Sequence, residues 1–366
     1  MTIHLVYVKG NSISTPYSIT YELAQRLSQQ AEVCVYDWTE ARTISPQPGD
    51  ILIGHPHPYQ NAVFVNSFWQ PGWHKRIILM PFHHAMLKYI AWLDPLVEAA
   101  DVFLAITGKY WIETMAGTLV SHWEPKIIHL DLAVNLNNFP RIKYQFNPPG
   151  KRRFLYIGHT LDYKGFDYLE QLAICNPNLA IGWIGGGRCR TNHITVHGIL
   201  DFTQAASLEL VSHYDFLLTC GRSDANPTTI LEAAAWGLIP ICTPQSGYYH
   251  EDWLINIPLD QPEAALKILN QLNYLSHAEL LHYQATAHVV LQHHYHWDRF
   301  AQQVIDCLTH EVPVFPTDGN WQMRAKKNRQ ALRWIARLTR WKTAIFQHIY
   351  QPVRYLISRI LRPLNL

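Results

Sequence analysis

The segment 216–243 constrains the fold of this 366-residue chain more than any other. It begins with the apolar run Phe-Leu-Leu-Thr-Cys and ends with Ile-Pro-Ile-Cys-Thr, and a polar loop and about three helical turns lie between them. Short apolar runs bounded by turn residues are typical of strands buried on both faces. Asn226 is a favoured N-cap, Pro227 suits the first helical position, and Gly237 follows the expected helix end. This order predicts a βαβ unit in a parallel sheet.

The same alternation of strand-like and helix-like segments runs through most of the chain. Strands are expected at 3–8, 33–36, 50–53, 76–80, 102–106 and 126–130, and then at 154–157, 180–184, 195–196, 216–219, 239–243 and 254–257. Helices are expected between most of them, at 17–29, 85–99 and 111–116 in the first half. The proline-rich break at 147–150 separates the two series. We therefore predict an α/β protein of two Rossmann-like parallel-sheet domains, 1–148 and 149–312, which face a cleft.

Composition excludes several classes of protein. Hydrophobic residues make up 48% of the chain and aromatic residues 12%, so a disordered or fibrous protein is not expected. The chain opens on a strand pattern rather than on a basic and apolar signal peptide, and it has no run of about 20 apolar residues. The six cysteines form no CxxC pair. We expect a cytoplasmic protein with reduced thiols, whose contact with a membrane is at most peripheral.

Two carboxylates flank the predicted start of the helix in segment 216–243. Asp224 falls in the loop and Glu232 falls in the helix, eight residues later. The backbone amides of Thr228 and Thr229 would point from the positive end of the helix dipole, which suits an anion such as a diphosphate. Both carboxylates could accept hydrogen bonds from sugar or ribose hydroxyls. On spacing alone, an ordinary βα turn with a solvated Asp and a surface Glu is the commoner interpretation.

Several motifs together resemble the retaining family 4 of nucleotide-sugar glycosyltransferases, which have the GT-B fold. The most specific is Ser-Asp-Ala-Asn-Pro at 223–227, continued by Leu-Glu-Ala at 231–233, which is similar to the family's ExxxxxxxE signature. The others are Gly158-His159 with Lys164-Gly165, the turn Gly185-Gly186-Gly187, Val196-His197-Gly198-Ile199, Phe82-His83, and the loop 11–14. The resemblance covers most of residues 1–310.

The resemblance implies a role for each matching residue. The catalytic set is His83, Lys164, Asp224 and Glu232. The donor-binding set is Asn11, Ser12, Gly158, His159, Lys164, Gly185, Gly186, Gly187, Ile199, Asn226, Pro227, Thr228, Thr229 and Glu232. The implied reaction moves a sugar from a UDP-, GDP- or ADP-sugar to a glycan or a lipid-linked saccharide, with retention of anomeric configuration. No cofactor and no metal are expected, because the chain has no DxD cluster and because His55 and His57 more simply shape a turn.

Two departures from the family pattern leave an alternative open. Asp224 is one methylene shorter than the usual Glu, and His159 replaces an Arg. A histidine of ordinary pKa is mostly neutral at cellular pH, so Lys164 would carry the charge of the leaving group nearly alone. The alternative is a catalytically inactive GT-B-like protein that binds glycans or nucleotides, or acts as a scaffold, at the membrane surface. A dehydrogenase is disfavoured because the turn at 185–187 lacks the third glycine of GxGxxG.

The last 48 residues differ sharply in charge from the rest of the chain. Residues 319–366 hold eleven Lys or Arg and no acidic residue, whereas the remainder holds 19 basic and 28 acidic residues. Apolar residues recur at helical spacing, namely Trp334, Leu338, Trp341, Ile345 and Ile349. This pattern predicts a basic amphipathic helical tail that binds an anionic membrane through residues 324–362. Packing of the tail on the acidic body or on a second subunit is the alternative, and no nucleic-acid partner is expected because the apolar face is too continuous.

Overall fold

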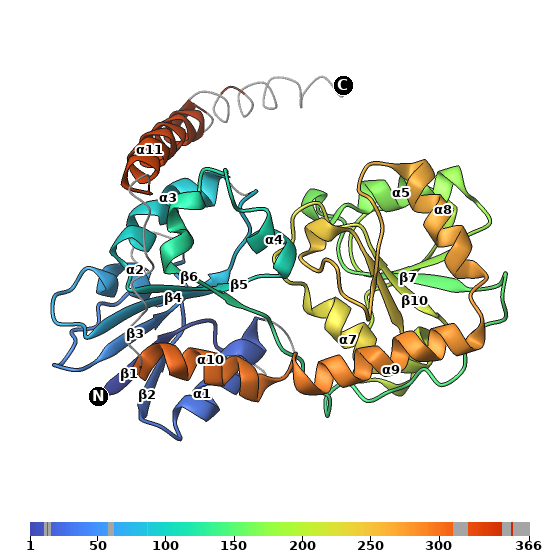
Figure 1. The fold of residues 1–366 in the computed structure, drawn as a ribbon, viewed down its shortest axis with the longest axis horizontal. Helices are drawn as coiled ribbons and strands as arrows, with labels where there is room; N and C mark the ends of the chain where they lie inside the picture. The colour runs from blue at the N-terminus through green and yellow to red at the C-terminus, as the bar shows by residue number, and fades with distance from the viewer. Residues whose placement is uncertain are drawn as a thin grey trace, which may run out of the picture.

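The protein forms two lobes, each built on a parallel six-stranded sheet (Figure 1). Apolar clusters of buried residues lie on both faces of each sheet. The computed structural model describes residues 1–10, 13, 16–57, 62–85, 87–309, 321–345 and 353. Most central strands are continuous hydrophobic runs because helices cover both sides of each sheet, whereas the edge strands at 32–36 and 194–198 are partly exposed. The predicted fold class, two Rossmann-like domains with a C-terminal helix, is confirmed.

The first sheet has the strand order β2-β1-β3-β4-β5-β6. Its strands are β1 (Thr2–Val6), β2 (Glu32–Tyr36), β3 (Ile51–Gly54), β4 (Lys75–Pro81), β5 (Val102–Ile106) and β6 (Ile127–Leu130). The helical segments between them are α1 (Tyr17–Leu27), α2 (Val63–Phe68), α3 (Leu87–Ala99), α4 (Lys109–Glu113) and the 3₁₀ turn η1 (Ser121–Lys126). The sequence analysis did not anticipate α2, which is less than two turns long.

The second sheet has the strand order β12-β11-β10-β7-β8-β9. Its strands are β7 (Arg153–Ile157), β8 (Ala180–Ile184), β9 (Ile194–Gly198), β10 (Phe216–Thr219), β11 (Ile239–Cys242) and β12 (Ile255–Asn256). The helical segments are η2 (Asp162–Lys164), α5 (Phe166–Cys175), α6 (Ala205–Ser212), α7 (Thr228–Trp236), η3 (Pro244–Ser246), α8 (Pro262–Asn273) and α9 (His277–His293).

The chain returns to the first lobe after α9. Helix α10 (Trp297–Thr309) packs against the first sheet, where Trp297, Phe300 and Val304 are buried beside α1. The predicted range 149–312 had assigned this segment to the second domain, so the last part of that range is corrected. The reason is that α10 has one strongly apolar face, and the first sheet supplies the surface that covers it.

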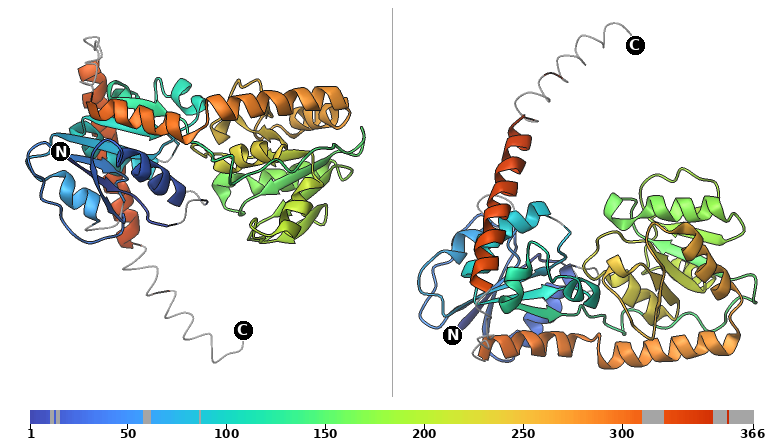
Figure 2. Two further views of the ribbon diagram at one scale, coloured as in Figure 1. Left: turned by 90° about the horizontal axis from the view of Figure 1, so that it is seen from below. Right: turned by 45° about the horizontal axis from the view of Figure 1, so that its top comes forward.

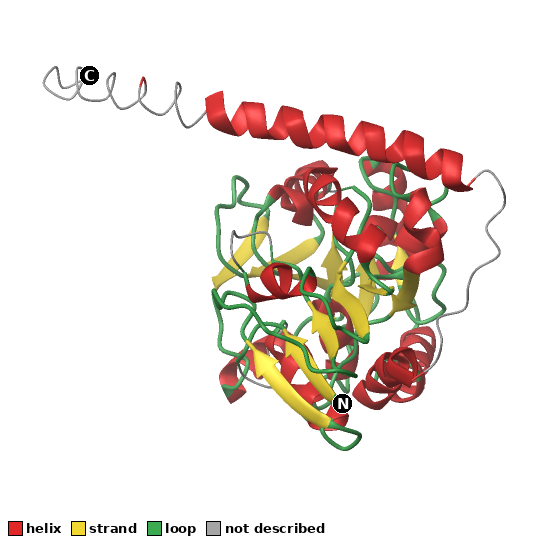
Figure 3. Cartoon of the chain, turned by 90° about the vertical axis from the view of Figure 1, so that its left-hand side faces the viewer, coloured by secondary structure: helices red, strands yellow, loops and turns green. Residues whose placement is uncertain are grey.

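Helix α11 (Trp321–Ile345) also packs on the first lobe (Figures 2 and 3). It lies against α3 and η1, with Ala325 and Leu332 buried, and Arg329 forms an ion pair with Glu98 at 2.8 Å. The sequence left open whether the tail packs on the body of the protein, and one face of α11 does so. The predicted apolar residue Ile349 lies outside the described residues.

Candidate functional site

Each sheet has one point at which the order of its strands reverses. In the second sheet this point lies between β7 and β10, and in the first sheet it lies between β1 and β3. The loops that leave such a strand pair run in opposite directions, which opens a crevice at the carboxyl ends of the strands. Gly158 and His159 follow β7, the loop to Asp224 follows β10, and His55 follows β3. The sequence-predicted residues thus lie where open α/β sheets bind ligands.

Lys164 and Asp224 come together at the crevice of the second sheet. Lys164 ends η2, and its ammonium donates a hydrogen bond to, and forms an ion pair with, the Asp224 carboxylate. The two loops approach closely because Gly165 has a positive φ of 66°, and a Cβ there would overlap the carbonyl oxygen of Cys220. The Trp111 indole of the first lobe donates to the Asp224 carbonyl oxygen at 2.6 Å.

His83 brings the first lobe to the same place. It follows β4, and its ring lies 5.1 Å from the Trp111 ring, centroid to centroid. Burial lowers the pKa of His83 to about 4, although the nearby charge of Asp224 opposes this shift. Its Nδ1 is buried and has no hydrogen-bond partner among the residues described. His83 is therefore neutral at physiological pH.

A cavity of about 530 Å³ joins His83 to Asp224. Residues from both lobes line it, namely Trp38, His55, Pro56, His57, Met80, Pro81, Phe82, His83, Tyr89, Ile90, Trp92, Leu93, Tyr163, Ser223, Asp224 and Ala225. Sequence reasoning did not select its aromatic residues, because single aromatic residues are usual in a core. A cue was available for Tyr163, which directly precedes Lys164 in the chain.

Glu232 lies in a different space. It lines a recess of about 10 Å³ with Ser18, Asn135, Thr228 and other residues of both lobes. Burial raises the pKa of the Glu232 carboxyl to about 7, although a hydrogen bond with the Thr228 side chain opposes this shift. The structure therefore does not place the two predicted carboxylates in one cavity, and the start of α7 lies between them in the sequence.

The start of α7 differs by one residue from the prediction. Pro227 occupies the N-cap position and Thr228 is the first helical residue, so Asn226 is not the cap. The Asn226 side chain is buried and accepts a hydrogen bond from the Tyr248 hydroxyl at 2.9 Å instead. No side chain caps the helix, so its first backbone N–H groups are available to a ligand.

The remaining donor-site predictions fall on one rim of the second sheet. The His159 ring nitrogen Nε2 lies 3.2 Å from the Tyr163 hydroxyl, and burial together with the charge of Lys164 lowers the pKa of His159. The Gly158 amide donates to Ile184, and the Gly185 amide donates to Gly198. These bonds join the two predicted glycine turns.

Beyond that rim, Gly187 ends the second glycine turn and has a left-handed φ of 136°. Ile199, which follows β9, is 82% exposed. Asn11 and Ser12 lie outside the described residues.

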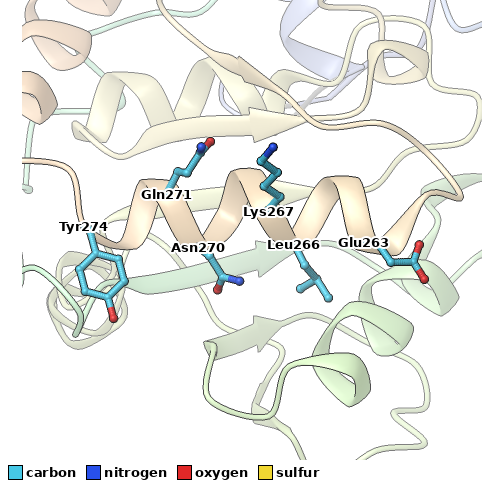
Figure 4. Close-up of a pocket in the computed structure, with 6 residues that line it drawn as sticks. All are labelled: Glu263, Leu266, Lys267, Asn270, Gln271 and Tyr274. Atoms are coloured by element: carbon cyan, nitrogen blue, oxygen red, sulfur yellow. The ribbon is translucent and has the colours of Figure 1, made fainter.

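A hollow of about 730 Å³ lies elsewhere, along α8 (Figure 4). Its lining residues, Glu263, Leu266, Lys267, Asn270, Gln271 and Tyr274, belong to one helix and the residue after it. In Figure 4 these side chains spread along the helix instead of converging on one point. A ligand site requires convergent polar groups, so this hollow is not a candidate.

Two further searches covered only the residues that the structure describes. They contain no group of three or more His, Cys, Asp or Glu placed to hold a metal ion. They also contain no helix with the length and apolar character needed to cross a bilayer. His55 and His57 pack on Trp38, with ring centroids 4.8 and 5.1 Å from it.

Neither a family model nor a curated protein matches this sequence. Solved structures do match. A sucrose-phosphate synthase from Thermosynechococcus elongatus superposes with a TM-score of 0.58 at 13% identity, over 84% of this chain and 98% of that one. An α-glucosyltransferase in complex with UDP and a 13-mer DNA superposes with a TM-score of 0.57 at 13% identity, over 85% of this chain and 99% of that one.

TarM gives a TM-score of 0.54 at 9% identity, over 73% of this chain, which spans only 56% of TarM. WaaG, a glycosyltransferase involved in lipopolysaccharide biosynthesis, superposes with a TM-score of 0.53 at 13% identity, over 84% of this chain and 100% of WaaG. These likenesses and the two parallel sheets establish that the chain has the GT-B fold.

Proposed function

We propose that this protein is a glycosyltransferase that moves a sugar from a nucleotide-diphosphate donor to a hydroxyl of a glycan or lipid-linked acceptor. The observation that carries the proposal is the ion pair between Lys164 and Asp224, because the Asp224 carboxylate also lines one cavity between the lobes together with His83. The structural likeness to WaaG, a glycosyltransferase, and to an α-glucosyltransferase in complex with UDP supports the same reaction class.

The chemistry requires stabilisation of a departing diphosphate. Lys164 and the uncapped N-terminus of α7 would supply positive potential at the position where negative charge accumulates. Asp224 would accept hydrogen bonds from hydroxyls of the donor sugar, and Glu232 from the ribose. When the donor binds, we expect the Lys164 ammonium to turn from Asp224 to the diphosphate.

We further propose that the reaction retains anomeric configuration and needs no metal. Among the described residues that line the cavity, Asp224 is the one carboxylate, and Lys164 already pairs with it. Lys164 and the start of α7 would supply the positive potential that a divalent cation supplies in other sites of this kind. A phosphate oxygen of the leaving group, rather than a protein base, would take the proton of the acceptor hydroxyl, since burial lowers the pKa of the cavity residue His83 to about 4 and makes it a weak base.

The test is nucleotide release from a panel of UDP-, GDP- and ADP-sugars in EDTA, with a membrane extract as the acceptor source. Lys164→Ala and Glu232→Ala are compared with the wild type, and Lys267→Ala and Glu263→Ala on α8 serve as matched controls. We expect release that survives EDTA, is lost in both site variants, and is unchanged in both controls.

Thermal stabilisation by each nucleotide separates the two functions that the sequence left open. Stabilisation without release would support the non-catalytic binding protein and overturn the enzyme. Release that requires a divalent cation would overturn metal independence alone. Absence of both stabilisation and release would overturn the nucleotide site itself.

We also propose that α11 holds the protein on an anionic membrane surface. Trp334, Leu338, Trp341 and Ile345 are 62, 42, 72 and 50% exposed, and they recur every three or four residues on the face opposite Leu332. Exposed Arg and Lys residues flank this stripe, and Arg333, Arg337 and Lys342 are among them. Interfacial tryptophans between cations suit a helix that lies at the headgroup level. Sedimentation with vesicles should show binding to phosphatidylglycerol but not to phosphatidylcholine, and binding to neither would overturn this proposal.

A further inference from the structure

The first lobe supplies most of the residues that line the cavity between the lobes. Most of its lining residues lie at the ends of β2, β3 and β4 or on α3. The four described lining residues from the second lobe are Tyr163, Ser223, Asp224 and Ala225. Its volume of about 530 Å³ falls within the usual range for small-molecule sites. The cavity therefore extends from Asp224 into the first lobe.

Aromatic rings dominate this wall. Trp38 is fixed between the rings of Tyr7, His55 and His57, with centroid distances of 5.5, 4.8 and 5.1 Å. Trp92 and Tyr89, on α3, also line the cavity. Flat rings present an apolar surface with a polar edge, and such surfaces suit a ligand that has an apolar face and a polar rim.

Two hydrogen-bonding atoms among the lining residues have no partner. The Nδ1 atoms of His55 and His83 are buried and form no hydrogen bond with any residue that the structure describes. Leaving such an atom unpaired costs about 1–3 kcal/mol. Both atoms are closed to solvent, so a ligand in the cavity does not reach them in this conformation, and the two histidine rings form part of the aromatic wall.

Charge restricts the ligand further. Among the lining residues that the structure describes, none is Lys or Arg, and the one carboxylate is that of Asp224. Burial lowers the pKa of His55 to about 3 and of His83 to about 4, and burial also lowers the pKa of His57. All three rings are neutral at physiological pH. A phosphate or carboxylate in this cavity would meet the Asp224 carboxylate, and the Lys164 ammonium beside it is already held by Asp224, so the desolvation of that anion would be poorly offset by the described lining residues.

We infer that this cavity binds the acceptor as an uncharged pyranose, with its ring face against Trp38, Trp92 and Tyr89. The inference rests on the proposed transferase function, because it takes the donor to occupy the second lobe. The sugar of the donor has the same chemistry as an acceptor sugar. The experiment therefore has to show whether the cavity binds the acceptor or the sugar of the donor.

The experiment is saturation-transfer NMR of free sugars on the full-length protein, in the presence and absence of UDP or GDP. The probes are the methyl and octyl glycosides of glucose, galactose and mannose, with glucuronic acid and glucose 6-phosphate as charged comparisons. Trp92→Ala and the milder Tyr89→Ala are compared with the wild type. Trp69→Ala is the matched control, since this exposed tryptophan follows α2 and does not line the cavity.

We expect at least one neutral glycoside to bind, and both charged sugars to bind at least tenfold more weakly. Trp92→Ala and Tyr89→Ala should weaken glycoside binding at least fivefold and leave nucleotide stabilisation unchanged, and Trp69→Ala should match the wild type. Equal or tighter binding of the charged sugars would overturn the inference. So would glycoside binding that neither cavity variant weakens, or an absence of glycoside binding by a protein that binds nucleotide.

Two outcomes separate this inference from the proposed function. If the cavity variants weaken binding of the nucleotide sugar as much as binding of the glycoside, the cavity holds the donor sugar and the acceptor assignment is wrong. If glycosides bind but no nucleotide does, the proposed transferase fails, and with it the assignment of the ligand as an acceptor.

Discussion

At the scale of single residues, the ion pair between Lys164 and Asp224 has a consequence for product binding. The pair is part-buried, and in the proposed reaction the diphosphate competes with Asp224 for the Lys164 ammonium. Asp224→Asn removes that competition. We expect the variant to bind a nucleoside diphosphate about fivefold more tightly, which corresponds to about 1 kcal/mol, while sugar transfer falls.

Calorimetry with UDP or GDP measures this effect, and the nucleoside without phosphates is the control. The nucleoside should bind both proteins equally, because it does not reach Lys164 in the proposed arrangement. A diphosphate that binds the variant more weakly than the wild type would contradict competition for this lysine.

Glu232 makes the stability of the protein depend on pH. Its folded-state pKa of about 7 lies above the ordinary value of 4.5, so the folded protein binds the proton more tightly than the unfolded chain does. The contribution of the protonated carboxyl is therefore present below pH 4.5 and is lost as pH rises through 7. Glu232→Gln has no such titration and does not lose this contribution. The free energy of unfolding of the variant minus that of the wild type should therefore increase between pH 5 and pH 8, by at most about 3 kcal/mol. Urea titrations at the two pH values measure the difference, and a constant difference would contradict a buried, protonated Glu232.

At the scale of elements, most strands could be predicted from the sequence because a strand buried on both faces is a continuous apolar run. The ranges 102–106, 180–184 and 216–219 match β5, β8 and β10. The very short α2 was missed because helical periodicity does not register over six residues. The placement of α10 was missed because an amphipathic pattern shows that a face is covered but not which sheet covers it.

The candidate site was predictable only in part, for a related reason. Motif residues such as Lys164 and Asp224 stand beside turn signals in the sequence, and those signals fix their place at the ends of strands. The aromatic wall of the cavity comes from separate loops and from α3, and no local pattern links Trp38 with Trp92. The free Nδ1 atoms of the histidines depend on tertiary packing and have no signature in the sequence.

Helix α11 has two faces with different roles. Leu332 is fully buried against the first lobe, whereas Trp334 is 62% exposed. Leu332→Ala should lower the free energy of unfolding by about 2–5 kcal/mol, because it leaves a cavity. Trp334→Ala should change it by no more than about 0.5 kcal/mol. Urea unfolding of the two variants checks this contrast, and equal losses would mean that the tryptophan face is covered as well.

At the scale of the whole molecule, a charged cluster stands where the chain crosses back to the first lobe. Asp131, after β6, lies 3.1 Å from His129 and 2.8 Å from His294, which follows α9. Burial opposes protonation of His129, but the hydrogen bond to Asp131 and its charge outweigh burial and raise the pKa of His129. The interaction of protonated His129 with Asp131 therefore contributes fully to stability below the ordinary histidine pKa. This contribution is lost as pH rises through the raised pKa of His129.

Asp131→Asn should accordingly destabilise the protein more at pH 6 than at pH 8.5. Melting temperatures of the wild type and the variant at both pH values measure the gap. A gap that widens toward pH 8.5 would show that the interaction with His129 does not control stability at this crossing.

Helix α3 connects the proposed acceptor cavity with the proposed membrane face. Tyr89 and Trp92 line the cavity, and Glu98, farther along α3, holds Arg329 of α11. A bilayer under α11 would therefore bring a lipid-linked acceptor near the cavity, and the gain would come from local concentration rather than from the chemical step. Trp334→Ala combined with Trp341→Ala should reduce transfer to a glycolipid in phosphatidylglycerol vesicles at least tenfold and leave transfer to a water-soluble glycoside unchanged. Parallel rate measurements with the two acceptors decide this, since an equal loss with both would place the two tryptophans in catalysis or folding, and no loss with either would remove α11 from acceptor capture.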